Sequence, residues 1–207
     1  GQMEAEDLSS FLNFYLTNVC EIALKYGGTI DKFIGDSVMI FFGDPDTKGA
    51  KEDAIACCQM AMEMLTFLEN NQQHFQDMYN FPEKLEIRVG IHNGLCNVGN
   101  FGSEQRLDYT AIGRTVNVAA RLEQAAPKNS ILVSSAIRNL IKNKFETSSP
   151  IEVIAKGIDK PIASYVLNRQ EPQNTKVIKE LDGLKLEYDP KKIDKNKLLE
   201  IISELEN

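Results

Sequence analysis

The sequence feature that most restricts the possible folds of this chain is a pair of short apolar runs on either side of a Gly-Asp pair. They cover residues 29–34 and 37–42, with Gly35 and Asp36 between them. Because glycine accepts the positive φ that a tight turn requires, the pattern predicts a β-hairpin. The hairpin would carry Lys32 on its first strand and Asp36 at its tip, where a carboxylate could reach a metal ion. Taken alone, the commoner interpretation is a solvated turn aspartate and a strand lysine.

The charge balance excludes a general attraction to polyanions. The 207 residues carry a net charge of −7, and the pI is about 5.0. We therefore expect no nucleic-acid partner and no membrane contact, so an anionic ligand must be met by local cations, backbone amides or a metal ion. No apolar stretch approaches the about 20 residues of a membrane span. Four cysteines without a CxxC spacing favour reduced thiols and a cytoplasmic location.

Apolar periodicity predicts helices and strands along most of the chain. A period of 3.6 residues predicts helices over residues 6–25, 50–71 and 114–126, and Ser134-Ser135 would begin another. Alternation predicts strands over residues 85–91, 95–98, 107–112, 131–133, 151–155 and 162–167. We expect residues 92–94 to turn the chain as a second hairpin, and residues 70–82 and 99–102 to form loops. Hairpins between the helices predict an α+β layered sheet rather than a doubly wound one.

The composition changes after Arg169. Residues 171–174 are typical of a linker, residues 177–188 alternate weakly, and residues 195–205 form an amphipathic helical pattern. We therefore predict a main domain over residues 1–169, followed by a linker and a small C-terminal accessory module over residues 170–207.

A second stretch, residues 108–121, carries side chains suited to a nucleotide. Asn117 and Arg121 are four residues apart on a predicted helix and share one face, so they offer donors to a phosphate or a sugar oxygen. Thr110 lies on the preceding strand, where its hydroxyl can both donate to and accept from a base edge. For each feature alone a structural interpretation is at least as good: a solvated helix face for the pair, and a β-branched strand residue for Thr110.

Other catalytic classes find little support. The chain has two histidines, His74 and His92, which makes a zinc cluster unfavourable, and we interpret His92 as structural. A GxSxG elbow, a Walker-type loop and a Gly-rich Rossmann turn are all absent from the sequence.

Six stretches in a fixed order make the combination specific. They are Tyr-Gly-Gly-Thr-Ile-Asp-Lys-Phe-Ile-Gly-Asp (26–36), Val-Gly-Ile-His-Asn-Gly (89–94), Gly-Asn-Phe-Gly (99–102), Asp-Tyr-Thr-Ala-Ile-Gly (108–113), Thr-Val-Asn-Val-Ala-Ala-Arg-Leu (115–122) and Ala-Lys-Gly-Ile (155–158). Together they closely resemble the catalytic domain of class III nucleotidyl cyclases, over about residues 4–168. The resemblance implies a ferredoxin-like βαββαβ core with flanking helices, and a head-to-tail homodimer with its active site at the interface.

The resemblance also implies a role for each candidate residue. Lys32 matches the lysine that binds the purine edge, and Thr110 stands at the second base-reading position, as in the subgroup that includes bicarbonate-responsive adenylyl cyclases. Asn117 matches the residue that positions the ribose, and Arg121 the residue that neutralises charge on the α-phosphate. Asp36 resembles one of two aspartates that hold two Mg²⁺ or Mn²⁺ ions. The implied enzyme is an adenylate cyclase, a phosphorus-oxygen lyase that acts on ATP.

The chain departs from the family pattern at the other metal-binding aspartate. The family carries it on a strand before the first helix, whereas these 207 residues start almost directly at that helix, and Asp7 lies too close to it to take the role. We therefore expect this polypeptide alone to be weak or inactive. Arg114, where the family often has Asp or Asn, is a minor departure.

Two other functions remain open at this point. One is a non-catalytic cyclase-homology module that binds nucleotide or dimerises to regulate a partner. The other is a guanylyl cyclase, although the family typically uses Glu with Cys or Ser for guanine, so that Lys32 with Thr110 favours adenine. An upstream sensor domain and a response to bicarbonate are further possibilities that the resemblance implies.

Overall fold

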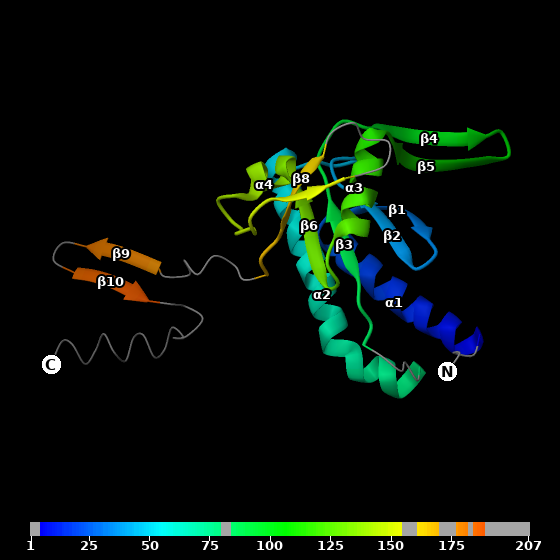
Figure 1. The fold of residues 1–207 in the computed structure, drawn as a ribbon, viewed down its shortest axis with the longest axis horizontal. Helices are drawn as coiled ribbons and strands as arrows, with labels where there is room; N and C mark the ends of the chain where they lie inside the picture. Colours follow the sequence, from blue (N-terminus) through cyan, green and yellow to red (C-terminus); the bar gives the residue numbers. More distant parts are fainter. Residues whose placement is uncertain (1–4, 80–83, 155–160, 170–176, 182–183, 189–207) are drawn as a thin grey trace.

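The computed structural model describes residues 5–79, 84–154, 161–169, 177–181 and 184–188 (Figure 1). The described elements are, in chain order, α1 (Ala5–Lys25), β1 (Thr29–Ile34), β2 (Ser37–Phe41), α2 (Ala50–Tyr79), β3 (Arg88–Ile91), β4 (Asn97–Ser103), β5 (Arg106–Ile112), α3 (Arg114–Ala125), β6 (Ser130–Ser134), α4 (Ser135–Ile141), β7 (Ile151–Val153), β8 (Ile162–Val166), β9 (Val177–Leu181) and β10 (Leu184–Tyr188). The predicted α+β class is confirmed, with hairpins and an antiparallel-rich arrangement of strands.

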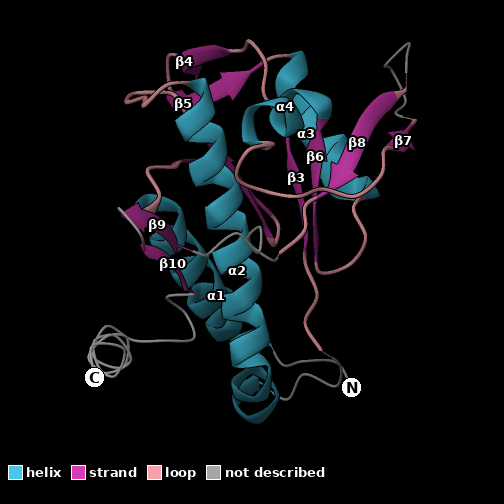
Figure 2. Ribbon diagram, turned by 90° about the vertical axis from the view of Figure 1, so that its left-hand side faces the viewer, coloured by secondary structure: helices cyan, strands magenta, loops and turns pink. Residues whose placement is uncertain are grey.

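A four-stranded sheet in the order β3-β6-β8-β7 forms the centre of the fold. β3 and β6 are parallel, and the other two pairings are antiparallel. Side chains alternate across β6: Ile131 and Val133 pack with α2 and α4, whereas Leu132 packs with α3. The apolar run at 131–133 is therefore buried on both faces, as a central strand between two helical layers requires. Figures 1 and 2 show these helices flanking the strands.

Helix α3 is held unusually close to the sheet. A Cβ on Gly90 of β3 would lie 2.2 Å from the backbone nitrogen of Glu123 and 2.4 Å from the carbonyl oxygen of Ala119. Only a residue without a side chain allows that approach. The contact fixes the helix that carries Asn117 and Arg121 directly against β3.

The predicted end of the second helix was wrong. Residues 70–79 continue α2 instead of starting a loop. Phe75 is fully buried, and its ring lies edge-on to Phe11 of α1 with a centroid separation of 5.5 Å. Leu68 and Phe75 both belong to the apolar cluster between α1 and α2. This tertiary packing outweighs the polar composition of the segment.

The predicted hairpin at residues 92–94 was also wrong, as was the loop at 99–102. β3 pairs with β6, and residues 99–102 lie inside β4, which pairs with β5 in an antiparallel hairpin. Gly102 lies one pair before the end of this ladder; its φ is +151°, and a Cβ there would lie 2.0 Å from the carbonyl oxygen of Arg106. The glycines permit this close turn rather than breaking the strand. The β4–β5 hairpin extends beyond the helical layers (Figure 1).

Some of the remaining predicted elements are confirmed, and others fall on residues that the structure does not describe. The helices at 6–25 and 114–126, the strands at 107–112 and 131–133 and the final strand pair are confirmed, apart from their ends. Ser134, the last residue of β6, caps α4, and its hydroxyl accepts from the Ile137 amide. β9 and β10 form an antiparallel hairpin, whereas the linker at 171–174, the helix at 195–205 and residues 155–158 lie outside the described residues. Among the described helices, none combines the length and the apolar character needed to cross a bilayer.

Candidate active site

The carboxylate of Asp31 gathers groups from two strands that are far apart in sequence. Thr110 Oγ1 on β5 lies 2.8 Å from both carboxylate oxygens, and the backbone N–H of Ala111 donates to Oδ2 at 2.8 Å. Lys32 Nζ lies 3.3 Å from Oδ1. The carboxylate is completely buried, whereas the Lys32 side chain is 44% exposed. The lysine therefore keeps a free side toward solvent while one charge partner fixes its position.

Backbone geometry explains how Asp31 reaches β5. In the β1–β2 ladder Ile30 pairs with Ile40, but Lys32 pairs with Met39, so Asp31 is an extra residue at an irregularity of the register. A bulge of this kind re-aims a side chain out of the normal alternation of a strand. Asp31 thus brings together Lys32 and Thr110, which are candidate site residues from two separate stretches of the sequence.

A signal for Asp31 was present in the sequence. Aspartate is disfavoured inside strands, yet Asp31 stands in the middle of a strand-forming run. Such a residue needs a partner when its carboxylate is buried. The identity of that partner, 79 residues away, could not be derived from the local pattern.

Asp36 lies at the β1–β2 turn and is exposed, as predicted. Burial and then the negative charge of Asp36 together raise the pKa of Tyr15 on α1 to about 12. The turn therefore lies near enough to α1 for its charge to act there. Asp36 offers the oxygen ligand that Mg²⁺ and Mn²⁺ prefer. Within the described ranges, no group of three or more His, Cys, Asp or Glu side chains is placed to hold a metal ion.

Asn117 and Arg121 both lie on α3, which follows β5 after the single residue Gly113. Asn117 is exposed and Arg121 is half-buried. Their spacing of four residues places the two side chains on one face of the helix. Arg121 Nη1 donates to Gln124 Oε1 at 2.7 Å, so its guanidinium is held by a neighbour on the same helix while further donors remain for an anion.

His92 is placed as its structural interpretation predicted. Its Nδ1 lies 2.9 Å from Ser134 Oγ, and burial lowers the pKa of the imidazole. The four cysteines are free thiols, and burial raises the pKa of Cys57 to about 12. Cys58 is buried in the core and Cys57 packs against it, so these two thiols contribute to packing rather than offering reactive side chains at neutral pH.

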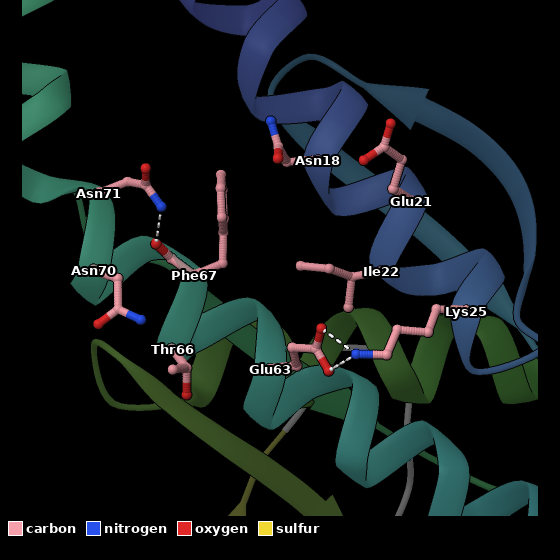
Figure 3. Close-up of a pocket in the computed structure, with 9 residues that line it drawn as sticks. All are labelled: Asn18, Glu21, Ile22, Lys25, Glu63, Thr66, Phe67, Asn70 and Asn71. Atoms are coloured by element: carbon pink, nitrogen blue, oxygen red, sulfur yellow. Dashed lines mark hydrogen bonds and ion pairs between the residues drawn. The ribbon is translucent and has the colours of Figure 1, made fainter.

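An open groove of about 410 Å³ lies between α1 and α2. Figure 3 shows Glu63 at one end of it, where Lys25 Nζ donates to both carboxylate oxygens at 2.7 Å. Tyr26 Oη also donates to Glu63, at 2.6 Å. The groove's lining residues include none of the predicted site residues, so it is a feature separate from the candidate site.

The sequence matches one protein family over most of its length. The family described as "Adenylate and Guanylate cyclase catalytic domain" matches residues 1–169. The chain is 33% identical over 168 residues to an adenylate cyclase of Anabaena cylindrica, a match that covers 79% of this chain and 32% of that protein. It is 36% identical over 137 residues to adenylate cyclase 1 of Rhizobium meliloti, covering 64% of this chain and 20% of that protein. The chain therefore spans a third or less of these two relatives.

Solved structures agree with the sequence comparison. The adenylyl cyclase CyaB from P. aeruginosa superimposes with a TM-score of 0.78 at 46% identity, covering 81% of this chain and 85% of that chain. The guanylyl cyclase Cya2 superimposes with a TM-score of 0.75 at 28% identity, covering 83% and 86%. The order of the motifs, the fold and both comparisons agree, and the chain belongs to the adenylate and guanylate cyclase catalytic domain family.

Proposed function

We propose that this chain is the catalytic domain of an adenylyl cyclase that converts ATP to 3′,5′-cyclic AMP and pyrophosphate. One observation carries the choice of ATP: Lys32 and Thr110 meet at the same buried carboxylate. A cationic donor and a hydroxyl side by side suit the edge of a purine ring. The 46% identity to a structure named as an adenylyl cyclase supports the same choice.

Each site residue then has a defined task. Lys32 and Thr110 bind the base, Asn117 orients the ribose, and Arg121 stabilises negative charge that develops on the α-phosphate. The 3′-hydroxyl oxygen forms a bond to the α-phosphorus, the bond from that phosphorus to the bridging oxygen of the β-phosphate breaks, and the hydroxyl proton is released. Asp36 would hold a divalent ion, which supplies Lewis-acid stabilisation of the triphosphate when bound.

A second copy of the chain is the proposed partner. Seven large apolar side chains are exposed on the β1–β2 hairpin and around the β4–β5 hairpin: Phe33, Ile34, Leu95, Phe101, Leu107, Tyr109 and Ile112. Exposed apolar side chains on neighbouring elements are typical of interaction surfaces. In a head-to-tail homodimer, Asp36 of one copy would serve a site whose Lys32, Thr110, Asn117 and Arg121 come from the other.

The main test is a cyclase assay with ATP or GTP and with Mn²⁺ or Mg²⁺. It should be run on this chain and on the chain extended N-terminally, because a two-ion site needs a carboxylate in addition to Asp36. We expect cyclic AMP from ATP, with higher rates for the extended form. If the extended form makes no cyclic nucleotide and Lys32→Ala leaves ATP binding unchanged, the non-catalytic regulatory function replaces this one. Preferential turnover of GTP would favour a guanylyl cyclase.

Two finer parts of the proposal concern regulation and location. Thr110 and the family resemblance favour a response to bicarbonate, which would be abandoned if added bicarbonate at constant pH left the cyclase rate unchanged. ATP as the substrate, together with free thiols, favours a cytoplasmic reaction. An upstream sensor domain would supply the activating signal.

A further inference from the structure

We propose that Asp31 sets the base selectivity of this site by fixing the direction of the Thr110 hydroxyl. The proposal rests on the proposed nucleotide-binding function and adds a positioning residue to it. Asp31 would not touch the nucleotide, because its side chain is fully buried. It would act through the two side chains that contact it, Lys32 and Thr110.

Hydrogen-bond chemistry determines the direction of the Thr110 contact. An ionised carboxylate can only accept, and a hydroxyl has one proton and two lone pairs. Thr110 Oγ1 lies 2.8 Å from both oxygens of Asp31, so the hydroxyl donates its single proton to the carboxylate. Only lone pairs remain for a ligand. Thr110 thus becomes an obligate acceptor, although threonine alone can take either role.

The same carboxylate holds the neighbouring donor. Lys32 Nζ contacts Asp31 Oδ1 at 3.3 Å and has further protons available. The site therefore presents an acceptor at Thr110 beside a donor at Lys32. Adenine offers the complementary pair, a 6-amino donor and the N1 acceptor, whereas guanine offers the O6 acceptor and the N1–H donor. With guanine in the same pose, acceptor would face acceptor and donor would face donor.

A second feature favours positioning over a purely structural role. Asp31 stands at the irregular point of the β1–β2 register, and its carboxylate receives the Ala111 amide as well as the threonine. The amide fixes the rotation of the carboxylate toward β5. With this orientation fixed, the direction of the Thr110 hydrogen bond does not depend on a nucleotide being present.

The test is the ratio of affinities for 3′-deoxy-ATP and 3′-deoxy-GTP, measured by titration calorimetry with Mn²⁺. Both analogues lack the attacking hydroxyl, so the measurement needs no turnover. Asp31→Asn introduces an amide N–H that can donate to Thr110 and release its proton toward guanine O6. We expect the preference for the adenine analogue to fall by about tenfold, the scale of one hydrogen bond. If Asp31→Asn does not fold, Asp31→Ser, which can also donate, should give the same loss.

A double-mutant cycle separates this mechanism from a general disturbance. In a Thr110→Val background, Asp31→Asn should change the ratio by less than about twofold, because the hydroxyl that it controls is gone. Thr110→Ser keeps a hydroxyl and should retain the preference. A tenfold effect of Asp31→Asn that persists in the valine background would overturn the proposal.

Glu63→Gln is the matched control. Glu63 also accepts from a hydroxyl and an ammonium, those of Tyr26 and Lys25, but it lies at the groove between α1 and α2. Its replacement should leave the ratio unchanged. If the wild-type chain binds the adenine analogue selectively through Asp31 but the extended form makes no cyclic AMP, only the proposed catalysis fails. If it binds neither analogue, or if Asp31→Asn leaves the ratio unchanged, this inference is overturned.

Discussion

Asp31 and Glu63 are two carboxylates with the same kinds of partner in different surroundings. Each contacts one hydroxyl and one lysine ammonium. The Asp31 side chain is fully buried, whereas that of Glu63 is 32% exposed. Asp31 also accepts a backbone amide, so its contacts join β1 to β5, whereas those of Glu63 join the end of α1 to the middle of α2.

The two carboxylates differ in what can replace their hydrogen bonds and ion pairs when these are lost. Water can solvate Glu63, Lys25 and Tyr26, so their ion pair adds little net free energy. Water has no comparable access to Asp31, and its partners on β5 are buried as well. Loss of one member there leaves a desolvated polar group without a partner. The same kinds of contact therefore contribute little to stability around Glu63, whereas around Asp31 they determine the local structure.

Removing the two carboxylates in turn should give the largest contrast in the free energy of unfolding. Asp31→Ala leaves the Thr110 hydroxyl and the Ala111 amide without an acceptor, and we expect a loss of about 3 kcal/mol in the free energy of unfolding. Glu63→Ala should lose about 1 kcal/mol or less. Urea unfolding followed by circular dichroism measures both. Equal losses would contradict the comparison.

Removing the two hydroxyls should give a smaller contrast. Thr110→Val takes one donor from a buried carboxylate and should lower the free energy of unfolding by about 1–2 kcal/mol. Tyr26→Phe removes a donor whose partner can be solvated, and should change stability by less than about 1 kcal/mol. Thermal and urea unfolding of the two variants beside the wild type provide the measurement. A costlier loss at Tyr26 would reverse the assignment of the two regions.

The pH dependence of stability should isolate the Glu63 cluster. The hydrogen bond to Glu63, then burial and the charge of Glu63, raise the pKa of Tyr26 from 10.0 to about 12. This stabilisation is fully present below pH 10 and is lost as the pH rises through about 12. The stability difference between wild type and Tyr26→Phe should therefore narrow over that range. If the stability difference between wild type and Tyr26→Phe stays the same across pH 10–12, the hydrogen bond to Glu63 is not the cause of the raised Tyr26 pKa.

In acid, the pH dependence of stability that comes from Glu63 has the opposite sign. Hydrogen bonds from Lys25 and then Tyr26 lower the pKa of Glu63 below its ordinary 4.5. Its contribution is present above pH 4.5 and is lost as the pH falls through the lowered value. Wild type and Glu63→Gln, unfolded by urea between pH 6 and 3, should thus converge toward the acid end.

Salt should produce the smallest effect. At about 1 M NaCl the Debye length falls to about 3 Å, which weakens exposed ion pairs more than buried ones. The stability cost of Glu63→Gln should shrink by a few tenths of a kcal/mol between low and high salt, whereas that of Asp31→Asn should not change measurably. Parallel urea titrations at the two salt concentrations test this difference.

Local patterns predicted the elements that carry the candidate residues, but not all of their connections. The hairpin around Asp36 and the helix with Asn117 and Arg121 follow from turn chemistry and periodicity, which act over a few residues. The extension of α2 to Tyr79 depends on Phe75 meeting Phe11 of α1. The pairing of β4 with β5 through Gly99 and Gly102 likewise depends on a partner strand. Such contacts outweigh local propensity because burial depends on what the whole chain places nearby.

The sequence alone determined the family, through six ordered stretches, and the chemical types available at Lys32, Asp36, Thr110, Asn117 and Arg121. It left the Thr110 hydroxyl free to donate or to accept. Only the tertiary structure decided which, by bringing the buried carboxylate of Asp31 within 2.8 Å across 79 residues of chain. The reason is that a side chain's polar groups are fixed by its identity, whereas the direction of a hydrogen bond is fixed by the partner that folding supplies.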